Sequence, residues 1–354
     1  MKLSDFDYYL PKDLIAQESV KPRDHSRLLV LRRIGCQIEH RHFYELVDYL
    51  KAGDVLVLNN SKVFPARLLG RKEGTGGRVE VFLLRPVHGQ CWQCLLGGRG
   101  CQIGLKIIFR FGLKAEVIKN NGDGTWDVKF NRPKPEMRQI VNRIGQVPLP
   151  PYIKRKSAES QKRKDRESYQ TVYADEKKVG SVAAPTAGFH FTKRLIRKLK
   201  DKGVQFEFIT LHVGLGTFAP VKVHDITKHK MHSEWVEVAA KTIKNIIKAK
   251  EEGRRIIAVG TTSVRTLEAI AGHILNPQTK VSPHKFQGWI DIFIYPPYRF
   301  KLVDAMITNF HLPKSTLLML VNAFAGRKCI DKSYQCAIKE KYRFYSYGDA
   351  MFIY

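Results

Sequence analysis

Hydrophobic positions near the start of the chain follow a helical spacing and then a strand-like one. Apolar residues recur at helical spacing over 43–50, Gly53 ends the pattern, and a continuous apolar run follows at 55–58. The alternation resumes after residue 191. It predicts helices at 192–202, 239–252, 263–273 and 317–324 and strands at 206–211 and 255–259. Such alternation favours an α/β fold with a mainly parallel sheet.

Between residues 78 and 130 the hydrophobic period shortens to two. Glycine-rich turns, of which 120–124 is the plainest, separate short runs of alternating residues. The pattern predicts strands at 78–84, 92–96, 105–111, 115–119 and 126–130. Because this antiparallel unit interrupts the α/β pattern, we expect an inserted β domain at 69–149. The α/β domain is then discontinuous, formed by 1–68 and 150–354.

The charge of the chain indicates a class of partner. Its 354 residues include 61 Lys and Arg against 33 Asp and Glu, a formal net charge of +28. Such a field attracts a polyanion: nucleic acid is the first interpretation, a membrane surface the second, and a generally lysine-rich composition the plain alternative. The run 154–166 holds seven basic and two acidic residues with almost nothing apolar, which predicts a mobile basic loop.

The sequence shows neither an apolar run long enough to span a bilayer nor the start of a signal peptide, so we expect a cytoplasmic protein. Its six cysteines are then expected to stay reduced, as ordinary buried thiols. Cys91, Cys94 and Cys101 lack a fourth zinc ligand, and the three histidines of 224–232 with Glu234 match no common zinc spacing. We expect no metal site.

The segment 182–191 is the first candidate for a functional site. Small residues and Pro185 lead to His190, which lies between Phe189 and Phe191. Small residues let a ligand approach the backbone, and aromatic neighbours desolvate an imidazole whose ordinary pKa is near neutrality. The alternative interpretation is a tight turn around a core histidine.

A glycine loop follows the strand predicted at 206–211. His212, Gly214, Gly216 and Thr217 stand in a pattern that formally matches a dinucleotide-binding loop. Such a site needs a helix to begin there, and the residues around position 220 do not begin one. We therefore predict that a ligand rests against this loop, close to His212 and Thr217.

A third candidate follows the next predicted strand. Thr261 and Thr262 open a helix whose free amides can hold a carboxylate or phosphate, with Arg265 one turn further on. Ordinary N-capping by either threonine is the alternative.

A fourth candidate lies at 308–316. Pro313 prevents an earlier helix start and leaves Asn309, His311 and Lys314 outside regular structure. A capped buried helix alone does not require this histidine.

These segments together resemble the S-adenosylmethionine:tRNA ribosyltransferase-isomerase family of queuosine biosynthesis. Three of the motifs read AAPTAGFHF at 183–191, TLHVGLGTF at 210–218 and AVGTTSVR at 258–265. Further matches lie at 5–8, 10–11, 14–17, 53–54, 66–68, 147–153, 169–174, 231–234, 308–316 and 342–351. The resemblance therefore runs from end to end. Three residues depart from the family pattern: Pro297, Ile290 and Phe189 stand where glycine, threonine and leucine are usual.

The resemblance implies a reaction. The ribosyl part of S-adenosylmethionine is transferred to 7-aminomethyl-7-deazaguanine at the tRNA wobble position and isomerised to epoxyqueuosine, with release of adenine and methionine. It implies S-adenosylmethionine as co-substrate, no metal and no prosthetic group. It also implies a distorted barrel-like α/β domain with an inserted small antiparallel β-barrel. We expect a monomer that acts on tRNAs with GUN anticodons, which accept Tyr, His, Asn and Asp.

His190 is the first candidate for the base at C5′ of S-adenosylmethionine. The sulfonium acidifies the C5′ hydrogens, and a neutral imidazole in an apolar setting suits their removal. His212 and His311 are alternatives, and Glu234 is a fourth. The candidates for holding S-adenosylmethionine are Gly214, Gly216, Thr217, Thr261, Thr262, Arg265, Asn309 and Asp349.

The tRNA backbone is predicted to follow Lys62, Arg67, Lys154, Arg155 and Lys314. Two rival functions remain open from the sequence. A non-catalytic RNA-binding protein would need only the charge and the small β unit. A methyltransferase that uses S-adenosylmethionine on RNA would release adenosylhomocysteine in place of adenine.

Overall fold

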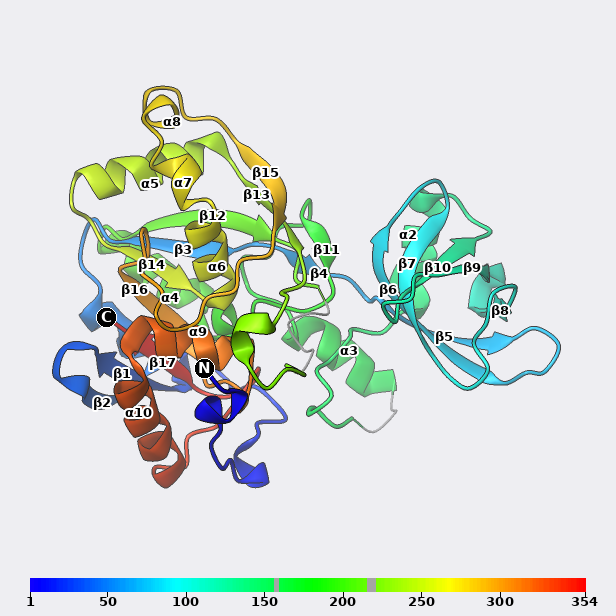
Figure 1. Ribbon diagram of the computed structural model, residues 1–354, viewed down its shortest axis with the longest axis horizontal. Helices are drawn as coiled ribbons and strands as arrows, with labels where there is room; N and C mark the ends of the chain where they lie inside the picture. The colour runs from blue at the N-terminus through cyan, green and yellow to red at the C-terminus, as the bar shows by residue number, and fades with distance from the viewer. Residues whose placement is uncertain (156–158, 215–220) are drawn as a thin grey trace.

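The larger part of the molecule is built on a nine-stranded sheet (Figure 1). The computed structural model describes residues 1–155, 159–214 and 221–354. In spatial order the strands are β15 (Phe286–Ile290), β13 (Glu234–Val238), β12 (Gln205–Leu211), β3 (Val55–Asn59), β14 (Ile256–Val259), β16 (Ala305–Asn309), β17 (Ala350–Ile353), β1 (Arg27–Arg32) and β2 (Gln37–His42).

The sheet is parallel at its centre and largely antiparallel toward its edges. Strands β12, β3, β14 and β16 run parallel, as the alternation of elements predicts. The pairs β15–β13, β13–β12, β16–β17 and β1–β2 are antiparallel, whereas β17–β1 is parallel. The expectation of a mainly parallel sheet is therefore wrong outside the centre. The central strands β3, β14 and β16 are buried along their whole length, because helices cover both faces.

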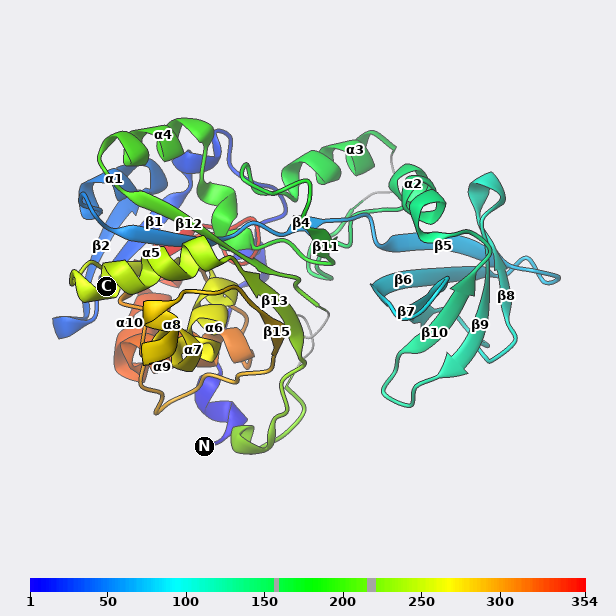
Figure 2. The same cartoon turned by 90° about the horizontal axis from the view of Figure 1, so that it is seen from above.

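Alternate residues of the central strands pack on opposite faces of the sheet. In β3, Val55 and Val57 join one hydrophobic core, while Leu56 and Leu58 join a second. Helices α1 (Leu46–Tyr49) and α4 (Lys193–Asp201) cover the second core (Figure 2). The other face carries α5 (Ala240–Glu251), α6 (Thr261–Ala269), α7 (Ala271–Ile274), α9 (Thr316–Ala325) and α10 (Arg327–Lys339). The short helix α8 (Pro277–Val281) follows α7.

The smaller part of the molecule is a closed antiparallel barrel, which lies beside the α/β part (Figure 1). Its strands, in spatial order, are β10 (Trp126–Phe130), β7 (Cys91–Gly97), β6 (Arg78–Pro86), β5 (Arg67–Lys72), β8 (Lys106–Ile108) and β9 (Lys114–Asn120). Helix α2 (Lys134–Ile144) buries Met137 and Val141 in the barrel core. A two-stranded sheet of β4 (Lys62–Val63) and β11 (Val179–Ser181) lies at the connection to the α/β part. The predicted fold class is confirmed.

Local patterns missed or misplaced several elements. The strands that were not expected are β1, β2, β4, β5, β11, β13, β15, β16 and β17, and the helices that were not expected include α2, α8 and α10. The strand predicted at 105–111 ends at Ile108. Phe111 and Gly112 there adopt positive φ, which turns the chain out of the strand. The predicted domain boundaries stay a prediction, although all barrel strands and α2 fall between residues 67 and 144.

The basic run does not form a loop throughout. Residues 156–158 lie outside the described residues, but helix α3 (Glu159–Ser168) occupies the second half of the run. An ion pair between Arg163 and Glu167, one helical turn apart, supports this helix. The guanidinium of Arg23 donates to carbonyls at the end of the helix. The prediction of a basic loop is therefore wrong from residue 159 onward.

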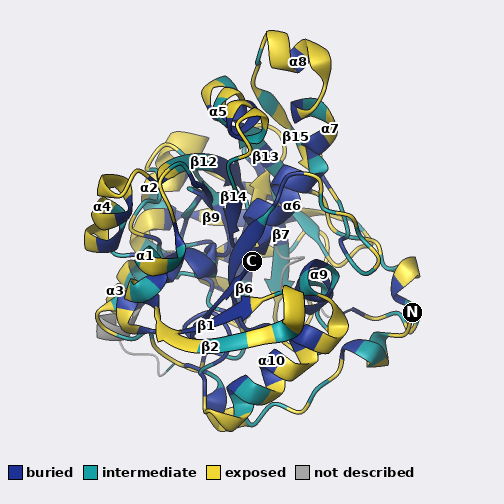
Figure 3. Ribbon diagram, turned by 90° about the vertical axis from the view of Figure 1, so that its left-hand side faces the viewer, coloured by how far each residue is buried: buried dark blue, intermediate teal, exposed yellow. Residues whose placement is uncertain are grey.

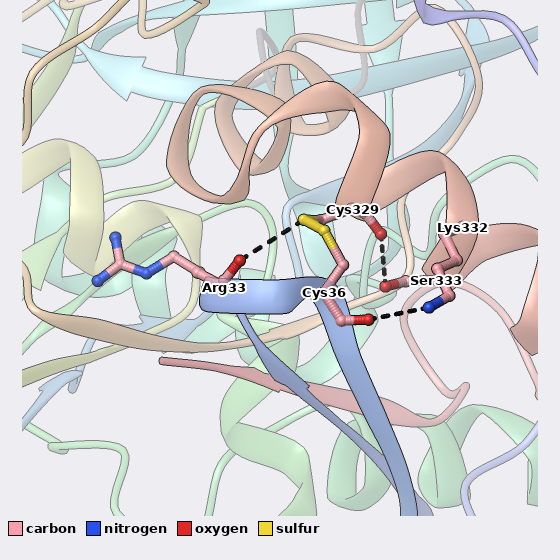
Figure 4. Close-up of a disulfide and its surroundings, with 5 residues drawn as sticks. All are labelled: Arg33, Cys36, Cys329, Lys332 and Ser333. Carbon is pink, nitrogen blue, oxygen red and sulfur yellow. Dashed lines mark hydrogen bonds between the residues drawn. A yellow bond between two sulfur atoms is a disulfide. The ribbon is translucent and has the colours of Figure 1, made fainter.

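Cys36 and Cys329 form a disulfide, contrary to the expectation of reduced thiols (Figure 4). The turn between β1 and β2 lies against the start of α10, so the two Cα atoms are 5.1 Å apart although 293 positions separate the residues. The Lys332 ammonium donates to the Cys36 carbonyl at 3.2 Å. The bridge ties an N-terminal hairpin to a C-terminal helix.

Within the described residues, no helix has the length and apolar character needed to cross a membrane.

Candidate active site

A small cavity lies where two neighbouring parallel strands end. Strands β14 and β16 are paired in register, so the segments that follow Val259 and Asn309 meet at one edge of the sheet. The cavity measures about 90 Å³. Its lining residues are Tyr152, 183–187, Val213, 260–262, 308–312, Ser315, Leu317, Tyr345 and Ser346. Three of the four predicted candidate segments thus contribute to one site, and the glycine loop reaches it through Val213.

His190 lies behind the wall of this cavity, at the end of the 3₁₀ turn Thr186–His190, and does not line it. Its Nδ1 is 2.7 Å from the Ser26 hydroxyl, and its Nε2 is 3.1 Å from the Asn309 side-chain nitrogen. The Asn309 oxygen accepts from Thr186, so its nitrogen donates and Nε2 of His190 accepts. Both imidazole nitrogens are therefore occupied by protein partners.

Burial lowers the pKa of His190 to about 3, with smaller effects from the cationic Arg343 and Arg23. The imidazole is therefore uncharged at neutral pH. Because its hydrogen bond and that of Thr186 fix the amide of Asn309, which does line the cavity, His190 acts on the site through Asn309. The geometry favours a positioning role for His190 over direct contact with a substrate.

His311 lines the cavity itself. Its Nε2 is 2.8 Å from the Thr308 hydroxyl, and Nδ1 has no hydrogen-bond partner among the described residues. The backbone of His311 is held from both sides, because its N–H donates to the Tyr334 hydroxyl at 2.9 Å and its carbonyl accepts from Tyr8. Burial lowers its pKa to about 3. When Thr308 accepts from Nε2–H, the lone pair of Nδ1 is free to take a proton.

The start of α6 brings unused donors to the cavity. Its N-cap is Gly260 with φ +86, and no side chain caps the helix, so the alternative of threonine N-capping is wrong. The amides of Thr261 and Thr262 have no acceptor within the described part of the chain, and there the Thr262 hydroxyl is also buried without a partner. Figure 3 shows α6 buried, so these groups face the interior and the cavity rather than bulk solvent. An anionic or polar ligand group fits them.

Arg265 and Glu234 form a buried ion pair and do not line the cavity. The Arg265 guanidinium also donates to the Ile292 carbonyl at 3.2 Å, and Glu234 accepts from the Gly214 amide at 3.0 Å. One nitrogen of Arg265, Nη2, is buried without a partner in the described residues. The pair links α6 and β13 to the start of the glycine loop, which indicates that it holds that loop in place.

His212 lies outside the lining, and its backbone amide donates to the Trp235 carbonyl of β13. Burial and the nearby Lys178 ammonium lower its pKa, while Glu237 opposes the shift. Its ring packs against Gly180, where an added Cβ would come within 2.7 Å. This contact requires glycine at position 180.

The remaining residues predicted to bind S-adenosylmethionine lie away from the cavity or outside the described residues. Asp349 is buried, and its carboxylate accepts from the amides of Arg27 and Arg343 at 3.0 and 2.8 Å, away from the cavity. Burial raises the pKa of Asp349, which these bonds oppose. Gly216 and Thr217 lie outside the described residues.

Four of the five predicted tRNA-binding cations are ion-paired. The pairs are Lys62–Glu176, Arg67–Glu80, Arg155–Asp165 and Lys314–Asp7. Lys154 is exposed and forms no ion pair within the described residues. These carboxylates reduce the charge that the four cations offer to a phosphate backbone.

Sequence patterns missed several residues that shape the site. Tyr345 and Ser346 line the cavity from the C-terminal segment, and the Tyr152 hydroxyl bonds Ser346 at 2.7 Å. Ser26 lies 164 positions before its partner His190. No local signal could have found that pair. Among the described residues, no His, Cys, Asp and Glu side chains gather in a way that would hold a metal ion.

Comparison with known proteins assigns the chain to a family. Residues 3–353 match the model of a family described as "Queuosine biosynthesis protein". A protein of Sulfurihydrogenibium sp. (strain YO3AOP1) is 53% identical and one of Thermotoga petrophila 51% identical, each over the full length of both chains. Both are named S-adenosylmethionine:tRNA ribosyltransferase-isomerase. The crystal structure of an S-adenosylmethionine tRNA ribosyltransferase from Thermotoga maritima is 39% identical, with a TM-score of 0.56, over 99% of this chain and 100% of that one.

Proposed function

Because the chain belongs to the queuosine biosynthesis family, we propose that it transfers the ribosyl part of S-adenosylmethionine to 7-aminomethyl-7-deazaguanine at the wobble position of tRNA. The transferred group is isomerised to epoxyqueuosine, and adenine and methionine are released. The observation that carries the proposal is one cavity lined by a neutral imidazole, that of His311, and by the free amides at the start of α6. S-adenosylmethionine is the co-substrate, and the proposal calls for no resident metal or prosthetic group.

His311 is the proposed base at C5′. It lines the cavity, its Nδ1 has no partner among the described residues, and its low pKa keeps it unprotonated at neutral pH. Transfer of a C5′ proton to Nδ1 leaves a sulfonium ylide, from which adenine departs with the electron pair of its bond to the ribose. The aminomethyl nitrogen of the tRNA base then attacks the sugar. His190 holds the Asn309 amide in the cavity wall.

The amides of Thr261 and Thr262 and the hydroxyl of Thr262 are the proposed contacts for the methionine carboxylate. They replace Arg265 in that role, because Glu234 already neutralises the guanidinium. The cavity of about 90 Å³ is smaller than the roughly 300 Å³ at the lower end of small-molecule sites. Binding of S-adenosylmethionine therefore requires the cavity walls to separate, or part of the ligand to lie outside it.

The experiment that tests the reaction is analysis of small-molecule products. The protein is incubated with S-adenosylmethionine and tRNA that carries 7-aminomethyl-7-deazaguanine. Free adenine and methionine support the proposal, adenosylhomocysteine would establish a methyltransferase, and tRNA binding without turnover would leave a non-catalytic RNA-binding protein. Comparison of GUN with other anticodons tests the proposed tRNA specificity, and size-exclusion chromatography tests the proposed monomer.

The base assignment is tested with two matched variants. His311→Gln is expected to lower kcat by about 100-fold or more while retaining S-adenosylmethionine binding, because proton transfer by a placed base contributes about 10²–10⁴. His190→Gln is expected to raise KM and lower kcat by less, because it disturbs only the support of Asn309. Near wild-type turnover by a folded His311→Gln protein would eliminate His311 as the base.

A further inference from the structure

The barrel carries a second cavity, a groove of about 890 Å³, which is larger than the cavity of the candidate active site. Its walls come from the β5–β6 hairpin, β8 and the adjoining turns. The lining residues are 69–74, Gly76, 78–80, Gly97 and 108–110. Figures 1 and 2 both show this hairpin on the side of the barrel away from the nine-stranded sheet. This barrel groove is therefore separate from the candidate active site.

Two arginines lie directly opposite each other on neighbouring strands of the barrel groove. Arg71 of β5 is paired in register with Arg78 of β6, and both side chains are exposed. Like charges directly opposite on neighbouring strands destabilise a sheet. The Arg71 guanidinium donates to the Gly76 carbonyl at 3.1 Å, and the Lys72 ammonium donates to the Gly100 carbonyl at 3.1 Å. Because both acceptors are uncharged carbonyls, the charges of Arg71 and Lys72 stay uncompensated. An anion in the groove would relieve this repulsion.

The two carboxylates of the barrel groove do not neutralise its cations. Glu73 pairs with Lys114 at 3.1 Å, and Glu80 pairs with Arg67 at 2.6 Å, and neither of these cations lines the groove. Four groove cations, in contrast, have no carboxylate partner among the described residues: Arg71, Lys72, Arg78 and Arg110. The groove thus carries free positive charge, whereas four of the five cations predicted from the sequence to bind tRNA are paired.

Apolar side chains lie exposed among these charges. Leu69 is 53% exposed and Ile108 38% exposed, and both line the groove. Phe111, 52% exposed, follows directly, with the guanidinium carbons of Arg110 and Arg143 at 5.6 and 4.8 Å from its ring centroid. Cations beside exposed apolar and aromatic surface match a nucleic acid, which offers phosphates together with sugar and base faces.

We propose that the barrel groove binds the tRNA substrate outside its anticodon loop. Arg71, Arg78 and Arg110 contact backbone phosphates, and Leu69 and Ile108 contact the sugars or an unstacked base. This inference rests on the proposed function, since it takes tRNA as the substrate. The wobble nucleotide, which belongs to the anticodon loop, enters the cavity at the ends of β14 and β16. The barrel groove lies on the far side of the barrel, so a part of the tRNA outside the anticodon loop reaches it.

The test compares two double variants of the full-length protein. Arg71→Gln with Arg78→Gln removes two groove charges, and Lys119→Gln with Lys129→Gln removes two exposed barrel charges outside the groove. Binding of full-length tRNA and of the isolated anticodon stem–loop is measured over a range of salt. The groove variant is expected to bind full-length tRNA about tenfold more weakly, with a salt slope lower by about 1–2. Its affinity for the stem–loop and the control variant's affinities stay at wild-type values.

Thermal unfolding of the groove variant is expected at or above the wild-type temperature, because the Arg71–Arg78 repulsion is gone. Adenine release by the control variant, which leaves the groove intact, is expected at the wild-type rate. Unchanged affinity and salt slope for full-length tRNA, or an equal loss for the stem–loop, would overturn the proposal. A failure of the proposed function is seen separately, as absence of adenine release by the wild-type protein.

Discussion

Acid is expected to destabilise the protein through the two imidazoles buried at the site. Folding lowers the pKa of His190 and of His311 to about 3, mainly by burial, from about 6.5 in an unfolded chain. Below about pH 6.5 the unfolded chain therefore binds protons that the folded chain does not. Their contribution to stability is complete above that pH and is lost as the pH falls toward 3. Between pH 7 and pH 5 the loss is about 1.9 kcal/mol for each imidazole.

The variant His190→Gln isolates one of these contributions. Urea unfolding at pH 7 and pH 5 gives the loss of unfolding free energy, and the variant is expected to lose about 1.9 kcal/mol less than the wild type. A background with Trp92→Phe and Trp126→Phe leaves Trp235 and Trp289 as reporters of the α/β part alone. Other titrating groups contribute equally to both proteins and cancel in the difference.

The control is His224→Gln, which removes an exposed imidazole from the same part of the molecule. It accounts for the effect of losing any one histidine. If His190→Gln and the wild type lose the same free energy to within about 0.5 kcal/mol, His190 is not buried as a neutral imidazole. The positioning role proposed for it would then fail as well.

Three other substitutions test contacts that hold the fold. Cys36→Ser breaks the bridge to Cys329, which spans 293 positions, and is expected to cost up to about 5 kcal/mol under oxidising conditions; equal urea stability of the two proteins would contradict this. Gly188→Ala places a methyl 1.8 Å from the Tyr173 hydroxyl, so the free energy of unfolding is expected to fall by about 2 kcal/mol or more. An unchanged melting temperature would disprove the close contact. Glu268→Ala removes the acceptor of three backbone amides at 301–303 and is expected to lower the free energy of unfolding by about 3 kcal/mol. These amides are then expected to exchange hydrogen faster than in the wild type, and unaltered protection would contradict the role of Glu268 as their acceptor.

The predictions that succeeded rest on local patterns. Continuous apolar runs predicted the buried strands β3 and β14, and alternation with glycine turns predicted most strands of the barrel. The segments around Pro185, Gly260 and Asn309 were selected for their small residues and unpaired polar groups, and all three line the cavity. Strand order places the segments around Gly260 and Asn309 together, because segments after neighbouring parallel strands emerge at one edge. The segment around Pro185 follows β11 of the separate two-stranded sheet, so only the tertiary structure brings it to the cavity.

The role of each polar side chain depended on partners far away in the chain. His190 is the first candidate from its local sequence, yet Ser26 and Asn309 occupy both of its ring nitrogens, and His311 is the histidine that lines the cavity. Arg265 has the place of an anion ligand in the sequence, but Glu234, 31 positions earlier, neutralises it.

The sequence by itself determined the fold class, the inserted β unit and the segments that form the site, because these follow from the period of apolar residues and from where glycine and proline interrupt it. Only the tertiary structure decided which imidazole reaches the cavity, which cations keep a free charge, and that Cys36 meets Cys329. Hydrogen bonds, ion pairs and disulfides form between atoms a few ångströms apart, and that proximity arises from packing of distant segments, which no local pattern encodes.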